Sequence, residues 1–129
     1  MVPKTVKACK LVPAVTVGIN DNAIEVAKKL HHFQERRIFV INEKKSPIGI
    51  ISLVDINDRV VAKGKDLKKT KAKDIMTYPL HLILDVNELL NTAMKKMVLK
   101  DNFYVPVTEK GVLKGLLTYS SVIKCMKKE

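Results

Sequence analysis

Residues 49–55 read Gly49-Ile-Ile-Ser-Leu-Val-Asp55, and residues 115–121 read Gly115-Leu-Leu-Thr-Tyr-Ser-Ser121. Each stretch places a glycine before two apolar residues and a hydroxyl residue. The second stretch follows the first by 66 positions in a chain of 129 residues. Self-similarity at a fixed distance indicates a duplicated structural unit. We therefore predict two repeats, residues 1–64 and residues 65–129.

The hydrophobic pattern around each stretch predicts the same order of elements: strand, helix, strand, strand and helix. In the first repeat the expected elements are Val15–Val17, a helix after Asn22, Arg37–Ile41, Ile48–Ser52 and Val54–Val61. In the second repeat they are Leu82–Leu84, a helix after Asn87, Tyr104–Val107, Leu113–Thr118 and Ser121–Lys127. This order predicts a mixed α/β (α+β) fold of two βαββα repeats. Because each half is too short to bury a sufficient core alone, we expect the two to pack around a pseudo-twofold axis.

Both long helices carry an N-terminal signal. Asn22, followed three residues later by Glu25, has the spacing of a capping box, and Asn87 is the expected cap of the second helix. The apolar stripe predicted for the first helix comprises Ala23, Ala27, Leu30 and Phe33 or Gln34. The stripe predicted for the second helix comprises Leu90, Ala93, Met94 and Met97. For both stripes the pattern favours core packing over contact with a cofactor.

Basic residues outnumber acidic residues by 24 to 13, which gives a net charge of +11. An excess of this size favours an anionic partner, whether a nucleic acid, a phosphorylated metabolite or an acidic protein surface. The basic residues are spread over both halves, so a lysine-rich solvated surface is the simpler interpretation. The stretch Lys63–Lys73 is predicted to be an exposed linker, with a phosphate-contacting strip as the alternative.

The two cysteines, Cys9 and Cys125, lie near opposite ends of the chain. Without CxxC spacing or a secretory context, they are expected to be reduced thiols in a cytoplasmic protein. The apolar stretch Leu11–Ile19 contains Pro13 and lacks a small-residue cleavage pattern, which favours a strand over a signal peptide. No apolar run approaches the roughly 20 residues that span a bilayer, so no membrane segment is expected.

The sequence offers little for catalysis. Neighbouring His31 and His32 point to different faces of a helix, and His81 stands apart, so no metal site is predicted. No HExxH, GxSxG or P-loop motif occurs. We therefore expect a protein that is not an enzyme.

Three motifs resemble the CBS domain family, and the resemblance covers nearly the whole chain. A repeat of that family begins with a segment such as Asp74-Ile-Met-Thr77, has a strand ending like Pro106-Val107, and closes with the pattern of Gly49–Asp55. The first repeat departs from this pattern at Ala8-Cys-Lys10, and the second departs from it at Ser121, where aspartate is expected.

The resemblance implies an adenine nucleotide or related adenosyl ligand in a central cleft between the repeats, with no required cofactor. AMP and ATP are the expected ligands, with ADP, S-adenosylmethionine and NAD as alternatives. It assigns the ribose to Asp55, because one carboxylate can accept from both vicinal hydroxyls, and a phosphate to Ser52. The remaining expected contacts are Arg36 and Arg37 toward phosphate, and Ile51, Tyr78, Pro79 and Leu80 around adenine.

Each main assignment has a structural alternative. Asp55 would cap the following helix, which is a position that aspartate favours. Ser52 would merely end a strand, and Tyr78 would pack in a core.

A second, weaker site is predicted from Thr118 and Ser121 together with Pro13, Ala14 and Val15. This site lacks the carboxylate. Replacing charge-assisted hydrogen bonds by the single bond of a serine loses roughly 1–3 kcal/mol.

The expected function is that of a ligand-binding regulatory module, commonly a homodimer, that signals to a partner protein. Two alternatives remain at this point. One is a basic nucleic-acid-binding protein on the same fold, and the other is a dimerisation unit without a ligand.

Overall fold

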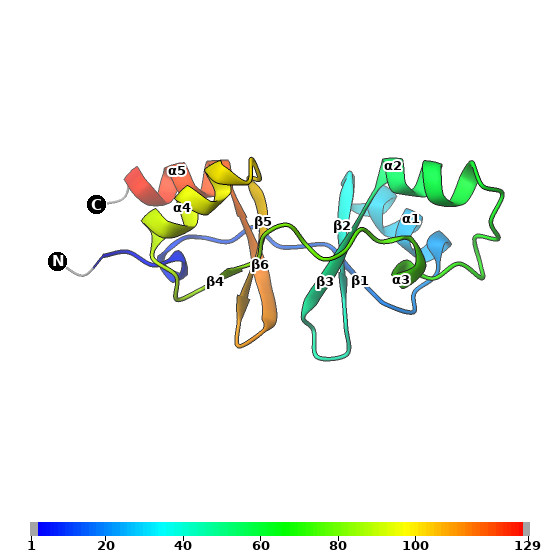
Figure 1. Ribbon diagram of the computed structural model, residues 1–129, viewed down its shortest axis with the longest axis horizontal. Coiled ribbons are helices and arrows are strands. Elements are labelled where there is room, and N and C mark those ends of the chain that lie inside the picture. The colour runs from blue at the N-terminus through cyan, green and yellow to red at the C-terminus, as the bar shows by residue number, and fades with distance from the viewer. Residues whose placement is uncertain (1–2, 128–129) are drawn as a thin grey trace. The chain divides into compact units, whose positions relative to one another are not determined.

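The computed structural model describes residues 3–127, which form two compact units (Figure 1). The central unit is Val15–Leu80. The terminal unit combines the described residues up to Ala14 with those from His81 onward. Segments from both ends of the chain therefore belong to one unit, although they come from different sequence repeats.

The central unit contains a three-stranded sheet in the order β1-β2-β3. Its strands are β1 (Thr16–Gly18), β2 (Arg37–Ile41) and β3 (Pro47–Ser52). β1 pairs parallel with β2, and β2 pairs antiparallel with β3. Its helical segments are α1 (Ala23–Phe33), α2 (Leu53–Ile56), the π-helical turn η2 (Asn57–Val61) and α3 (Ala72–Ile75).

The terminal unit repeats this arrangement with a sheet in the order β4-β5-β6. Its strands are β4 (Leu84–Asp85), β5 (Tyr104–Glu109) and β6 (Val112–Thr118). Again the first pair is parallel and the second antiparallel. Its helical segments are the 3-10 turn η1 (Val6–Ala8), α4 (Leu90–Leu99) and α5 (Tyr119–Lys127). The predicted mixed α/β fold of two βαββα repeats is therefore confirmed.

Each unit has its own hydrophobic core beneath its sheet. The core of the central unit contains Val17, Ala23, Val26, Leu30, Ile38, Val40, Ile51, Val60, Ala72 and Ile75. The core of the terminal unit contains Val6, Cys9, Leu84, Val86, Leu90, Ala93, Met97, Val105, Val107, Leu117, Val122 and Cys125. Apolar β-branched residues therefore fill both sheets, and the helices cover them with one apolar stripe each.

The start of α1 is as predicted, but its buried stripe is shifted. Asn22 Oδ1 accepts from the Glu25 backbone N–H at 3.0 Å, and Glu25 Oε1 accepts from the Asn22 N–H at 3.3 Å. The buried positions are Ala23, Val26 and Leu30. The prediction that Phe33 or Gln34 continues the stripe is wrong, because the helix ends at Phe33 and both residues are exposed.

The start of α4 differs from the prediction. The helix begins at Leu90, and Leu89 rather than Asn87 is the N-cap residue. Leu90 N–H donates to the carbonyl of Lys4 at 2.9 Å. In Figure 1 the dark-blue N-terminal segment accordingly runs beside β4 and α4. Because a tertiary partner satisfies this helix end, no local capping side chain is needed.

The segment Lys63–Lys73 is exposed except at Thr70 and Ala72. Residues 63–69 are exposed, as predicted, but Thr70 is 8% exposed and Ala72 is fully buried. Their backbones bond to the start of α1, since Ala23 N–H donates to the Thr70 carbonyl at 2.9 Å. The end of this segment is therefore a packed part of the central unit.

Cys9 and Cys125 form a disulfide. The prediction of two reduced thiols, made from the absence of CxxC spacing and of a secretory context, is wrong. The fold brings the Cα atoms of these residues to 5.2 Å although they are 116 positions apart along the chain. Both half-cystines are buried in the core of the terminal unit. The two cysteines therefore give no indication of a cytoplasmic location.

Candidate functional site

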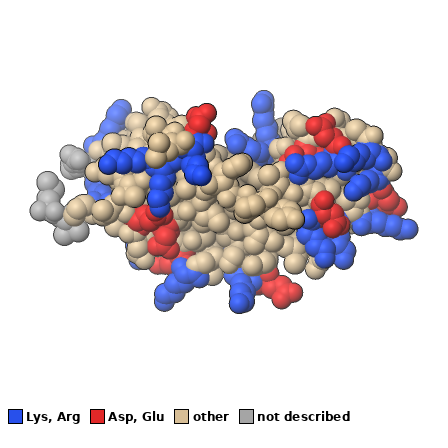
Figure 2. All heavy atoms as spheres, viewed as in Figure 1, with Lys and Arg blue, Asp and Glu red and all other residues tan. Residues whose placement is uncertain are grey.

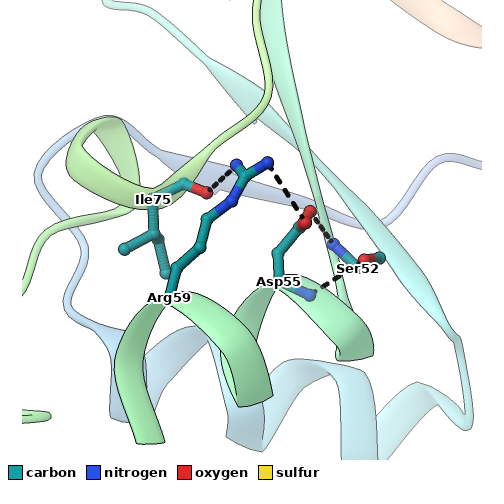
Figure 3. A network of polar contacts seen from close by, with 4 residues as sticks. All are labelled: Ser52, Asp55, Arg59 and Ile75. Carbon is teal, nitrogen blue, oxygen red and sulfur yellow. Dashed lines mark hydrogen bonds and ion pairs between the residues drawn. The ribbon is translucent and has the colours of Figure 1, made fainter. Parts of the chain in front are cut away.

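The corner between β3 and α2 holds two of the predicted binding residues (Figure 3). Ser52 ends the strand and is the N-cap of α2, where its Oγ accepts from the Asp55 backbone N–H at 3.1 Å. Asp55 Oδ2 accepts in return from the Ser52 backbone N–H at 2.9 Å. The two residues therefore form a reciprocal capping box that fixes the direction of the carboxylate.

Arg59 holds the other oxygen of this carboxylate. Its Nη2 lies 3.5 Å from Asp55 Oδ1, and its Nη1 donates to the Ile75 carbonyl at 2.7 Å (Figure 3). Arg59 was not predicted as a site residue, although its distance of four residues from Asp55 on a helix was a usable signal. The Asp55 side chain is 17% exposed. Because a carboxylate has about four lone-pair positions, it can still accept hydrogen bonds from a ligand.

The predicted adenine contacts follow a segment outside the sheet, residues 76–77, that pairs with β3. We call such a segment, which pairs with the last strand of a unit, a crossing segment. Thr77 and Ile50 exchange backbone hydrogen bonds of 2.8 and 3.0 Å, so Tyr78 follows directly after a segment paired with β3. The Tyr78 side chain is 67% exposed, which excludes the alternative of core packing. Pro79 is exposed and Leu80 is half-buried.

The other predicted residues lie around the same strand. Arg37 is the register partner of Ser52 in the β2–β3 pair. Arg36 is exposed, and its carbonyl accepts from the Leu53 N–H at 3.0 Å, so it lies beside the start of α2. Ile51 is fully buried within the core of the central unit.

The terminal unit contains a cavity of about 570 Å³. It is lined by Lys4, Ala8, Lys10, Leu11, Val12, Pro13, Thr118, Ser120, Ser121, Lys124 and Cys125. Three residues of the predicted second site, Pro13, Thr118 and Ser121, thus come together here. Ala14 is not among the lining residues, and Val15 packs against the core of the central unit. The size lies within the roughly 300–1,000 Å³ range of small-molecule sites.

A crossing segment also forms this cavity. Val12 and Leu116 exchange backbone hydrogen bonds of 2.9 and 2.7 Å, as Thr77 and Ile50 do in the central unit. At the following corner the Thr118 and Ser121 hydroxyls lie 2.9 Å apart, and Thr118 Oγ1 accepts from the Ser121 N–H at 3.2 Å. Hydroxyls therefore occupy the place that the carboxylate has in the other unit.

The cavity is also lined by three lysines that were not predicted from the sequence as site residues. Lys10 and Lys124 are exposed, and Lys4 Nζ donates to the Cys125 carbonyl at 2.8 Å. No acidic side chain is among the lining residues in the described part of the chain. The cavity therefore favours an anionic ligand. The only signal in the sequence was the unusual segment Ala8-Cys-Lys10.

Within residues 3–127, no group of three His, Cys, Asp or Glu side chains could hold a metal ion. Across the same residues, no helix has both the length and the apolar character needed to cross a membrane.

Comparison with protein families matches the CBS domain twice, to residues 7–62 and to residues 72–128. The chain belongs to the CBS domain family. These two matches cover most of the chain and correspond to the duplicated pattern of elements described above.

Individual relatives support this membership. An uncharacterized protein of Methanopyrus kandleri is 32% identical over 111 residues, which are 85% of this chain and 56% of that protein. The chain thus spans little more than half the length of this curated relative.

Two solved structures have the same fold and were determined with a nucleotide. The CBS domain protein PAE2072 of Pyrobaculum aerophilum, complexed with AMP, has a TM-score of 0.67 and 25% identity, covering 98% of this chain and 92% of that one. CBSX2 in complex with AMP has a TM-score of 0.73 and 19% identity, covering 95% of this chain and 96% of that one. These proteins carry AMP on a CBS fold.

Proposed function

We propose that this chain is a non-catalytic regulatory module that binds an adenine nucleotide or related adenosyl ligand and signals to a partner protein. The observation that carries the proposal is the fixed Asp55 carboxylate at the β3–α2 corner. The two similar folds complexed with AMP support it. AMP and ATP are the first ligands to test, followed by ADP, S-adenosylmethionine and NAD.

In the proposed central site, Asp55 accepts hydrogen bonds from the two ribose hydroxyls. Ser52 and one of the exposed arginines, Arg36 or Arg37, contact a phosphate. Tyr78 and the residues after it cover the adenine, which suits an aromatic side chain that is exposed beside a paired strand. Because a carboxylate accepts such bonds more strongly than a serine, adenosine and AMP prefer this site over the terminal cavity.

We further propose that the module acts as a homodimer through its helices. Each unit exposes large apolar side chains on the helix after its last strand: Leu53, Val54 and Val61 in the central unit, and Tyr119 and Met126 in the terminal unit. Ligand binding would shift the population between two packings of the assembly and so signal to the regulated protein.

Isothermal titration calorimetry with AMP tests the central site. Asp55→Ala removes half of the capping box, so Asp55→Asn is the sharper variant because its amide oxygen can still accept from Ser52. We expect Asp55→Asn to weaken AMP binding at least about tenfold with little change in melting temperature. Glu25→Gln is the matched control, since it makes the same carboxylate-to-amide change in another capping box of the same unit.

Unchanged AMP affinity in Asp55→Asn would contradict the role of the carboxylate.

The alternative functions are tested by titrating the protein with the same nucleotides and with short RNA and DNA at two salt concentrations. On the face drawn in Figure 2, Lys and Arg occur over both units with Asp and Glu among them. Binding of nucleic acid that falls steeply with salt, without nucleotide binding, would replace the proposal. A dimer that binds none of these compounds would indicate a purely structural role.

A further inference from the structure

Cys125 attaches the last turn of α5 to the N-terminal segment, which comprises residues 3–14. Cys125 is buried, whereas its neighbours in this turn, residues 124, 126 and 127, are exposed. Its side chain forms the disulfide with Cys9, and its carbonyl accepts from Lys4 Nζ at 2.8 Å. One residue therefore makes both a covalent and a polar contact between this turn and the other end of the chain.

On the other side of the disulfide, backbone hydrogen bonds hold the N-terminal segment in place. Before Cys9, the N–H groups of Val6 and Lys7 donate to carbonyls of residues 86–88, each at 2.9 Å. After Cys9, Val12 pairs with β6. These bonds do not depend on the covalent link. Breaking the disulfide therefore leaves the N-terminal segment attached to its unit and releases the last turn of α5.

The disulfide lies beside the terminal cavity. Cys125 is among the residues that line this cavity, whereas Cys9 is not, so a small thiol inside it meets Cys125 first. Lys10 and Lys124 each stand next to one bonded cysteine in the sequence, and both line the cavity. Neither lysine takes part in the ion pairs found among residues 3–127. Their charge favours the thiolate form of an attacking or a leaving thiol, which is the form that thiol–disulfide exchange requires.

We propose that the Cys9–Cys125 disulfide is a redox-active site that a small dithiol opens from the terminal cavity, and that its reduction releases the last turn of α5. A thiolate of the dithiol attacks Cys125 Sγ, and Cys9 leaves. The second sulfur of the dithiol then displaces Cys125, which oxidises the dithiol to its own disulfide. Each cysteine leaves as a thiolate and takes up a proton that a dithiol sulfur has given to water. Because Lys124 and Cys125 line the cavity, release of this turn opens one of its walls.

Treatment of the oxidised full-length chain with dithiothreitol, without nucleotide, tests the reaction. Thiols trapped with N-ethylmaleimide and counted by mass spectrometry give the rate of reduction. We expect both cysteines to be labelled in the native protein, and about 1 M urea to change the rate by less than about twofold, because the site opens locally. Acceleration by about tenfold in the same urea would mean that reduction requires global unfolding, and would overturn the inference.

Two lysine variants test whether the attack comes from the cavity. The double variant Lys10→Gln/Lys124→Gln should slow reduction about threefold at low salt, with a smaller difference at high salt. Lys127→Gln is the matched control, because Lys127 lies on the same helix and is not among the residues lining the cavity. It should leave the rate unchanged. Equal rates in the double variant and the wild type would contradict attack from the cavity.

Amide hydrogen exchange measured by NMR tests the release of α5. In the reduced protein, the amides of residues 124–127 should exchange at least about tenfold faster than in the oxidised protein, while those of Val6 and Lys7 stay protected. Cys9→Ala/Cys125→Ala should exchange like the reduced protein. If this variant does not fold, the two redox states of the wild type still make the comparison. Equal exchange of residues 124–127 in both states would overturn the inference, and so would loss of protection at Val6 and Lys7. Neither result bears on the proposed function, because the redox step needs no nucleotide.

Discussion

At the scale of single residues, two glycines allow a crossing segment to approach a strand. A Cβ built on Gly115 would lie 2.9 Å from both Leu11 Cβ and the Val12 carbonyl oxygen. A Cβ built on Gly49 would overlap the Met76 side chain. Both glycines lie beside the backbone pairings that join the crossing segments to their sheets. The glycine of the repeated motif therefore leaves room for the crossing segment. In the terminal unit this segment includes Leu11 and Val12, which line the cavity.

Gly115→Ala should destabilise the protein by about 1–3 kcal/mol, because backbone atoms cannot move aside as a flexible side chain can. Urea denaturation measures the change in the free energy of unfolding. Gly18→Ala is the control, since a Cβ there meets its nearest neighbour, Asp21 Oδ2, at an ordinary 3.6 Å. Equal stability of the two variants would show that the crossing segment tolerates the methyl group.

At the scale of elements, the two long helices begin in different ways. The start of α1 is satisfied locally by the capping box of Asn22 and Glu25. The start of α4 has no side-chain cap. Instead, its Leu90 N–H donates to the carbonyl of Lys4. Local sequence therefore specifies one helix start, and the fold of the terminal unit supplies the other.

This difference predicts unequal effects for two asparagine substitutions. Asn22→Ala should lower the free energy of unfolding by about 1 kcal/mol, since it removes a capping acceptor. Asn87→Ala should change it by less than about 0.5 kcal/mol, because that side chain is not the cap of α4. Chemical denaturation of both variants makes the comparison, and a larger effect at Asn87 would contradict this account of α4.

The elements that could be predicted from the sequence are those fixed by local patterns. β2 was predicted to the residue, and the α1 cap was predicted because its signals lie within one turn. Phe33 was misplaced because the spacing of apolar residues does not show that the helix ends at this position. In the candidate site, Ser52 and Asp55 could be predicted because they belong to the motif Gly49–Asp55. The lysines of the cavity belong to no such motif. They come together only because the N-terminal segment packs against α5, more than a hundred residues away.

At the scale of the whole molecule, the two units have the same backbone arrangement but different side chains at the corner after the last strand. Both units share the sheet order, the crossing segment and the hydroxyl at the strand end. They differ in charge at the positions that follow this hydroxyl. The equivalent corners of the two units therefore present different polar groups.

The disulfide closes almost the whole chain into one loop, and this makes stability depend on redox conditions. Linking residues 116 positions apart restricts the unfolded chain strongly, so reduction by a dithiol should lower the free energy of unfolding by about 2–5 kcal/mol. Urea denaturation with and without the dithiol measures this difference. The double variant Cys9→Ala/Cys125→Ala should match the reduced protein and show no response to the reductant. A wild-type protein equally stable in both conditions would mean that the packing of the N-terminal segment on α5, and not the covalent link, holds the terminal unit together.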